Sequence, residues 1–353
     1  MNIADICRLR LENQQLSMHQ FSSVQDVVRH MGATQAQDFP MAKLALCMRV
    51  PEGTVSMVEE ALNAGSVLRT HVLRPTWHIV AAEDIRWMTE LTATRIKAHM
   101  ATNNRKLGLD DAIFRKSNAL IEKAFSDVDF LDRTEIQDAL TAGGILLGEN
   151  RLSHILENAE LDQVICSGAI RKGKATYALL DRRVKRTKPK KKDEALYALA
   201  ERYFTSHAPA TLRDFSWWSG LSLTEAKMAV NMLGEKLLSE EVGGQTYHIF
   251  PGEKGSPAAS QQQDVFFLPA FDEFVIAYAD RSVVINQKHI TRAISQNGIF
   301  KPVLVHKERV IGTWKRSVHK NTATIEAEYF FKKDKLKAAQ LKNAGKKLNE
   351  MLL

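Results

Sequence analysis

The chain has 353 residues, and 49 lysines and arginines against 41 acidic residues give it a formal net charge of +8. No stretch approaches the roughly 18 uninterrupted apolar residues of a membrane-spanning helix, and the first residues have no basic or apolar signal region. Cys7, Cys47 and Cys166 are too far apart for a zinc set, and they favour a reducing cytoplasm. The positive charge favours a polyanionic partner, although it also fits an ordinary soluble surface.

The first segment, 1–95, predicts three helices, over 3–13, 23–30 and 57–64, followed by a hairpin over 68–80. Three helices and a two-stranded wing are the order of a winged helix. The pattern is looser here than in the two segments that follow.

The second segment, 96–181, repeats this order. Apolar residues at helical spacing predict a first helix over 111–128, and further helices are expected over 132–143 and 150–166. A hairpin is predicted over 169–180, and its tip is strongly basic. The basic residues of the tip are Arg171, Lys172 and Lys174.

A basic run follows at 182–193, with eight lysines or arginines among the eleven residues of 182–192. Such a run cannot bury itself, so it is either a plain solvated linker or one that grips phosphates. The next segment, 194–255, gives the clearest winged helix. A serine cap at Ser222 opens its third helix, and Gly243 and Gly244 separate two alternating runs.

The last segment, 256–353, has a different pattern of predicted elements. Strands are expected over 265–268, 274–278, 302–306 and 323–329, and a basic helix over 332–353 closes the chain. The sequence therefore predicts a mainly α fold with β structure (α+β): tandem winged helix-turn-helix domains and a small C-terminal β-rich domain. Such arrays bind nucleic acid by placing a helix in the major groove, but winged helices also serve as protein-interaction modules.

Conventional catalytic signatures are absent: we find no GxGxxG, Walker A, HExxH or GxSxG pattern and no zinc-deaminase pair. A polar set remains at 34–40, where Gly32 and Pro40 favour a loop or helix entry. In such a loop Gln35, Gln37 and Asp38 can converge on a water. Taken alone, the two glutamines are better interpreted as surface or capping residues.

A second polar set lies in the 68–80 hairpin. In strand geometry Arg69 and His71 share one face, and Trp77 is available to stack on a base.

Here the sequence resembles the AlkZ/AlkX family of bacterial winged-helix DNA glycosylases. The resemblance rests on four stretches in the family's order: TQAQDFP at 34–40, LRTHVLRPTWHIV at 68–80, LPAFDEFVIAYADR at 268–281 and VIGTWKR at 310–316. It implies a monomer that acts on double-stranded DNA and excises alkylated purines or unhooks interstrand crosslinks. The family's catalytic motif maps onto Gln35, Ala36 and Gln37.

The resemblance also implies residue roles. Gln35 and Gln37 would orient a water against C1′, with Asp38 as a helper. No lysine adjoins the motif, so the expected enzyme is monofunctional. No ligand set is evident, so no cofactor or metal is expected. Contacts to DNA are expected from the hairpin and from the basic tip: Arg69, His71, Arg74, Trp77, His78, Arg171, Lys172 and Lys174.

Other residues receive structural roles. Asp272, Glu273 and Arg281 are expected to pin parts of the chain together, and Trp217 and Trp218 are expected in a core. The alternative to an enzyme is a non-catalytic winged-helix DNA-binding protein, either a regulator or a lesion-binding scaffold. A regulator would usually carry one helix-turn-helix per subunit and bind as a dimer.

Overall fold

The contacts of the chain gather into two units, which we describe separately. Unit 1 consists of Met1–Val58 with Tyr197–Leu353, and unit 2 of Glu59–Leu196. The computed structural model describes residues 1–148, 150–251, 264–319, 322–332 and 335–352. About 49% of the chain is helical and 18% is strand, which confirms the predicted α+β class. The division into five segments, and the naming of its parts as winged helices, stay predictions.

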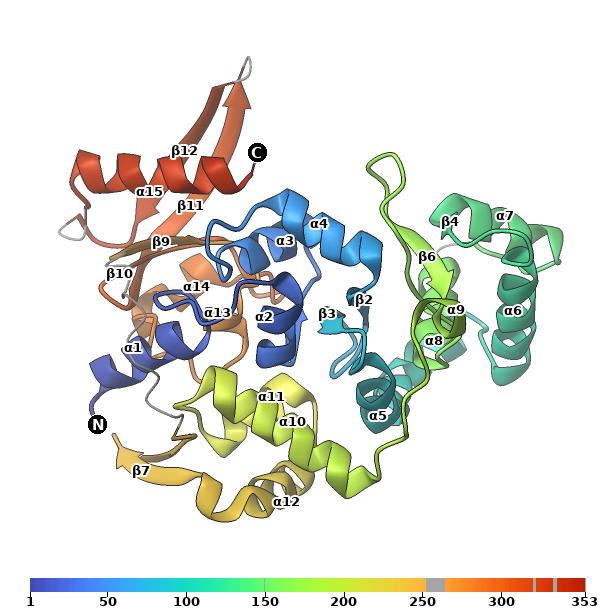
Figure 1. The fold of residues 1–353 in the computed structure, drawn as a ribbon, viewed down its shortest axis with the longest axis horizontal. Coiled ribbons are helices and arrows are strands. Elements are labelled where there is room, and N and C mark those ends of the chain that lie inside the picture. Colours follow the sequence, from blue (N-terminus) through green and yellow to red (C-terminus); the bar gives the residue numbers. More distant parts are fainter. Residues whose placement is uncertain (149, 252–263, 320–321, 333–334, 353) are drawn as a thin grey trace. The chain divides into compact units, whose positions relative to one another are not determined.

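Unit 1 joins both ends of the sequence, as the blue and the yellow-to-red elements of Figure 1 show. Its N-terminal elements are α1 (Ile3–Asn13), α2 (Val24–Met31), β1 (Ala33–Gln35), α3 (Phe39–Cys47) and α4 (Val55–Ala64), which continues into unit 2. After residue 196 it contains α10 (Lys192–His207), which begins in unit 2, α11 (Leu212–Ser219), α12 (Leu223–Leu233), η1 (Gly234–Lys236), β7 (Leu238–Val242) and β8 (Gln245–Ile249).

The predicted helix starts and the predicted turn of this second stretch are present. The Ser222 side chain accepts a hydrogen bond from the backbone N–H of Glu225, and so begins α12. Strands β7 and β8 pair antiparallel. The turn between them uses Gly243 and Gly244 at φ of 59° and 76°, a conformation that glycine adopts without the steric cost of a Cβ. Three helices followed by a hairpin is the order that the sequence predicts.

The C-terminal stretch of unit 1 builds an antiparallel sheet in the order β12-β11-β10-β9, and α15 packs beside β9 (Figure 1). Its elements are β9 (Val265–Leu268), α13 (Glu273–Ile276), η2 (Gln287–His289), α14 (Ile290–Ala293), β10 (Val303–His306), β11 (Arg309–His319), β12 (Thr322–Tyr329) and α15 (Ala338–Met351).

The strand predicted over 274–278 is wrong, because α13 occupies this position. The Asp272 side chain accepts a hydrogen bond from the Phe274 backbone N–H at 2.9 Å, which starts a helix instead. A short apolar run carries no periodicity that separates a buried strand from a buried helix.

The described part of unit 2 contains a hairpin, five complete helices and a small three-stranded sheet in the order β4-β6-β5. Its elements are β2 (Val67–His71), β3 (Trp77–Ala81), α5 (Ile85–Lys106), α6 (Asp111–Ala124), β4 (Leu131–Asp132), α7 (Arg133–Ala142), α8 (Arg151–Leu161), β5 (Ile165–Ser167), β6 (Thr176–Leu179) and α9 (Leu180–Arg183). The sequence did not predict α5, although it is the longest described helix.

The helix predicted over 150–166 is too long. It ends as α8 at Leu161, Gln163 takes a left-handed φ of 60°, and the chain returns as β5 against β6. Buried apolar side chains from α6, α7, α8, β5 and β6, among them Phe125, Ile136 and Ile155, form one core cluster. Trp77 of the hairpin packs against this cluster.

Unit 1 encloses two arginines whose charges are matched by carboxylates. Arg49 donates two hydrogen bonds of 2.9 Å to the two oxygens of Asp272, and both side chains are essentially buried. Arg10 is also buried: it lies 3.7 Å from Asp214 and 3.5 Å above the ring centre of Tyr278. A buried ion pair does little for net stability, but leaving one charge without its partner is costly.

Breaking the Arg49–Asp272 pair should therefore destabilise unit 1 strongly. We expect Asp272→Asn to lower the free energy of unfolding by about 3 to 5 kcal/mol, because the guanidinium stays buried without a counter-charge. Urea unfolding followed by circular dichroism measures this loss. Arg8→Gln, which removes an exposed i,i+4 pair with Glu12, is the control and should cost less than about 0.5 kcal/mol. Equal effects of the two variants would contradict the prediction.

Unit 2 buries a histidine in its hairpin. His78 on β3 is completely buried, and its Nδ1 lies 3.0 Å from the carbonyl oxygen of Thr76. Burial lowers the pKa of His78 to about 3, and the nearby charge of Arg74 acts in the same direction. The folded protein therefore holds this imidazole neutral.

This burial predicts that acid destabilises the protein well above pH 3. The unfolded chain takes up a proton at His78 below its ordinary pKa of about 6.5, whereas the folded chain does not until about 3. The stability that His78 contributes is present above pH 6.5 and falls with pH, by about 2 kcal/mol at pH 5. His78→Gln should flatten the dependence of the melting temperature on pH between 7 and 5. His99→Gln, which removes an exposed histidine of the same unit, should leave it unchanged; an equal slope in all three proteins would refute the prediction.

Candidate functional site

The segment 35–38 leads from β1 into α3. The Gln35 side chain is buried, and its Oε1 accepts a hydrogen bond of 3.0 Å from the backbone N–H of Gln37. The Gln37 side chain is exposed. Gln35 thus braces the turn, while Gln37 presents an amide to solvent.

Asp38 stands where α3 begins. Its Oδ1 accepts a hydrogen bond of 3.2 Å from the backbone N–H of Met41, which makes it the N-cap of the helix. The loop or helix entry that Gly32 and Pro40 favoured is therefore the structure found here. The catalytic help expected of Asp38 stays a prediction, since its carboxylate already serves the helix.

Glu273 on α13 holds the start of this turn. Its Oε1 accepts a hydrogen bond of 2.6 Å from the backbone N–H of Gln35, and its Oε2 accepts one of 3.2 Å from Nε1 of Trp218. Nε2 of His207 lies 3.5 Å from the same Oε2. Burial lowers the pKa of His207, while hydrogen bonding to Glu273 opposes this shift. Glu273 itself is 3% exposed, so all these contacts lie in the interior of unit 1.

The other residues of the 268–281 stretch have separate partners. Asp272 pairs with Arg49, as described above. The Arg281 guanidinium lies 5.0 Å from the ring centres of both Trp217 and Phe300. Trp218 is completely buried as expected, but the core position expected for Trp217 is wrong: its side chain is 41% exposed, with its Nε1 bonded to the carbonyl of Ile276.

The hairpin β2–β3 gathers three of the expected DNA-binding residues. The Trp77 ring centre lies 4.0 Å from that of His71 and 4.0 Å from the Arg69 guanidinium. His71 contacts Glu160 of α8 twice, through its backbone N–H at 2.9 Å and its Nδ1 at 2.7 Å. The Trp77 ring is thus engaged within the protein, which weighs against the base stacking expected of it.

Two further hairpin residues lie near its tip. Arg74 is half-buried, and the fully buried His78 faces the Thr76 carbonyl. A neutral, enclosed imidazole is poorly suited to contact a phosphate. The DNA contacts expected of Arg74 and His78 stay predictions, and for His78 the burial weighs against them.

The basic tip expected in 169–180 is exposed. Arg171 and Lys174 face each other across a tight turn, in which Lys172 and Gly173 have φ of 51° and 74°. Arg171 forms an ion pair with Glu135 of α7. Lys172 and Lys174 are exposed, so their charges can meet an approaching polyanion.

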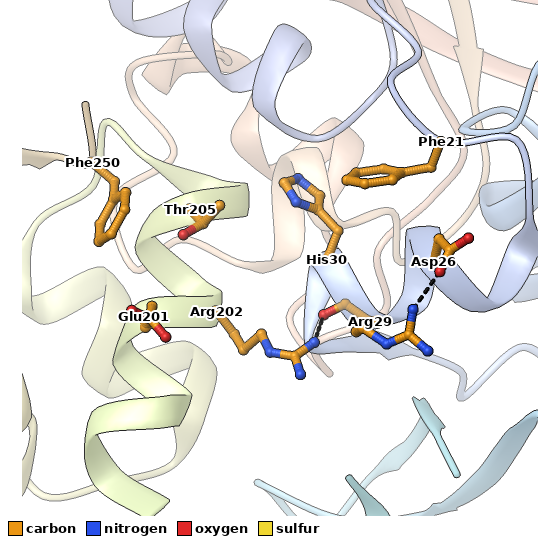
Figure 2. A pocket seen from close by; sticks show the side chains of 8 residues that line it. All are labelled: Phe21, Asp26, Arg29, His30, Glu201, Arg202, Thr205 and Phe250. Carbon is orange, nitrogen blue, oxygen red and sulfur yellow. Dashed lines mark hydrogen bonds and ion pairs between the residues drawn. The ribbon is translucent and has the colours of Figure 1, made fainter. Parts of the chain in front are cut away.

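A separate cavity of about 320 Å³ lies between α2 and α10 in unit 1 (Figure 2). Its charged groups are engaged with protein partners: Asp26 with Arg29, Arg202 with the carbonyl oxygen of Arg29, and Glu201 with Lys236. Its lining residues are Phe21, Asp26, Arg29, His30, Glu201, Arg202, Thr205 and Phe250. None of the expected site residues is among them.

Sequence reasoning missed three groups that bind expected site residues. Glu160, His207 and Arg49 each contact an expected site residue, but they lie far from it in the chain. Glu273, which binds the Gln35 backbone, lies in the 268–281 stretch and was predicted to have a structural role. Within the described ranges we find no group of three metal-ligating side chains, and no helix long and apolar enough to cross a membrane.

Comparison with known proteins identifies the family. The family described as "DNA glycosylase AlkZ-like" matches residues 28–351. An "Interstrand DNA cross-link repair glycosylase" from Streptomyces sahachiroi is 24% identical over 319 residues, 86% of this chain and 85% of its own length. The solved structure of the Streptomyces sahachiroi DNA glycosylase AlkZ superposes with a TM-score of 0.81 at 19% identity, covering 99% of this chain and 96% of that one.

The family match spans most of the length of this chain, which therefore belongs to the AlkZ-like family of DNA glycosylases, enzymes that hydrolyse glycosidic bonds in DNA.

Proposed function

We propose that this DNA glycosylase hydrolyses the N-glycosidic bond of N7-alkylated purines and unhooks interstrand crosslinks in double-stranded DNA. The observation that carries the proposal is the turn at 35–38, in which one glutamine braces the backbone and the next presents a solvent-exposed amide. The relative from Streptomyces sahachiroi, which is named for crosslink repair, supports the choice of substrate.

Hydrolysis of this glycosidic bond needs few catalytic groups. An N7-alkylated guanine carries positive charge and leaves readily without an acid catalyst. The protein must then position a water against C1′ and stabilise a sugar that becomes oxocarbenium-like. In this proposal the Gln37 amide oxygen orients the water, Gln35 fixes the backbone of Gln37, and Asp38 helps by holding the start of α3.

The remaining parts of the proposal rest on single observations. The stretch 34–40 contains no lysine for a Schiff base, which supports a monofunctional enzyme. The described thiols of Cys7, Cys47 and Cys166 are buried and are not joined in disulfides, which supports a reducing cytoplasm. We propose further that the protein works as a monomer and that no cofactor or metal takes part.

The proposed mechanism predicts the effects of replacing the two glutamines. On a duplex with a single N7-methylguanine, and on one with an N7-linked crosslink, the wild type should release the base or unhook the strands without added metal. Gln37→Ala should slow the single-turnover rate by about 100-fold, because it removes the group that orients the water. Gln35→Ala should also slow it, because the turn loses its brace.

Alkali-sensitive strand breaks and unhooked strands measure these rates, and fluorescence anisotropy measures DNA affinity, which both variants should keep. Gln296→Ala, which removes an exposed glutamine of the same unit, is the matched control and should react like the wild type. Tight binding by the wild type without base release on either substrate would refute the proposed substrates and favour a lesion-binding role.

The proposed DNA binding predicts the effect of removing charge from the basic tip. If Lys172 and Lys174 each neutralise one phosphate, replacing both by glutamine should reduce the slope of log K against log salt by about 1.8, at about 0.9 per phosphate. The base-release rate at saturating enzyme should not change. Lys116→Gln with Lys123→Gln, which removes the same charge from the exposed face of α6, is the control. Equal slopes for both double variants would exclude the tip as a phosphate contact.

A further inference from the structure

The turn at 35–38 is tied to the interior by a chain of two hydrogen bonds. Glu273 Oε1 accepts from the backbone N–H of Gln35 at 2.6 Å, and Gln35 Oε1 accepts from the backbone N–H of Gln37 at 3.0 Å. Each bond fixes a main-chain group, so a displacement of the Glu273 carboxylate moves the backbone that carries Gln37. Glu273 itself does not reach the solvent.

The carboxylate of Glu273 is in turn held firmly. Asp272 precedes it, caps α13 through the Phe274 N–H and binds Arg49 through both oxygens. Because these contacts fix the first residue of a short helix, the position of the Glu273 backbone is set by the buried Arg49. The second oxygen of the carboxylate, which does not bind Gln35, accepts a hydrogen bond from Nε1 of Trp218.

Only a carboxylate satisfies this arrangement fully. Two N–H donors, one from the Gln35 backbone and one from Trp218, meet two different oxygens of Glu273. An amide of the same shape has a single oxygen, so one buried donor would lose its acceptor and face an NH2 group instead. The bond to Gln35 would also lose the strength that a charged acceptor gives.

We propose that Glu273 is a positioning residue for the glycosylase reaction, which holds the Gln35–Gln37 turn in its productive geometry. The inference rests on the proposed function of Gln37. Glu273 does not touch the substrate; it acts through the Gln35 backbone. A side chain that would otherwise be assigned to structural support then controls the rate of the chemical step, because small displacements of a water-orienting group are costly.

The experiment compares four variants and one control variant with the wild type in single-turnover base release on the N7-methylguanine duplex. Glu273→Ala removes both oxygens and should slow the chemical step by about 100-fold. Glu273→Gln, which keeps the shape, should slow it by about tenfold, because Gln35 and Trp218 compete for one oxygen. Trp218→Phe keeps both oxygens of Glu273 and should stay within about threefold of the wild type.

The double variant Glu273→Gln with Trp218→Phe gives the decisive comparison. Without the indole N–H, the amide oxygen can turn to the Gln35 N–H and the NH2 group can face Nε2 of His207. The double variant should therefore react faster than Glu273→Gln alone, a recovery that general destabilisation would not produce. DNA affinity should be unchanged throughout. Trp314→Phe, which removes a buried indole bond to the Leu268 carbonyl elsewhere in unit 1, controls for lost stability and should not slow the reaction.

Amide hydrogen exchange over residues 33–38 gives a readout that does not depend on activity. The Gln35 amide should exchange slowly in the wild type and in Trp218→Phe, faster in Glu273→Gln, and slowly again in the double variant. Rates for Glu273→Gln equal to the wild type, or identical exchange in all proteins, would overturn the inference. Absence of base release by the wild type would overturn the proposed function alone, since hydrogen exchange still decides whether Glu273 holds the turn.

Discussion

Two neighbouring carboxylates, Asp272 and Glu273, connect parts of unit 1 that lie far apart in the sequence. Asp272 neutralises Arg49, which follows the C-terminal end of α3, and Glu273 binds the backbone at the end of β1. Buried carboxylates are expensive unless hydrogen bonds and counter-charges surround them. Once present, they permit few arrangements of the chain around them. The conformation of the 35–38 turn, between β1 and α3, follows from this constraint.

The turn that results is small, and the proposed reaction needs no more. A cationic leaving group requires no strong acid, and a developing oxocarbenium ion requires partial negative charge and a positioned water. Neutral amides supply both without the desolvation cost of a further charge. Precision therefore has to come from the backbone, and buried hydrogen bonds to main-chain N–H groups provide it. In the proposed mechanism, this separation of roles accounts for an enzyme without any of the familiar catalytic signatures.

In unit 2, too, a buried carboxylate holds a segment of the backbone. Glu160 of α8 binds both the backbone and the ring of His71, and Trp77 packs between the hairpin and the core cluster. Several residues that look like DNA ligands in the sequence thus hold the hairpin on its helices. Lys172 and Lys174, at the tip of the β5–β6 connection, keep their charges at the surface.

The sequence by itself determined the α+β class, most helix starts, the Gly243–Gly244 turn and the glycosylase family, because caps, turns and short motifs act locally or can be compared residue by residue. It also located the Gln35–Asp38 segment and its entry into a helix. Only the tertiary structure decided that α13 is a helix, that Gln35 is buried while Gln37 is exposed, and that His78 and Trp77 face inward. These features depend on partners such as Glu273 and Glu160, which lie 238 and 89 residues away in the chain. Local patterns carry no information about contacts over such separations, so packing alone settles them.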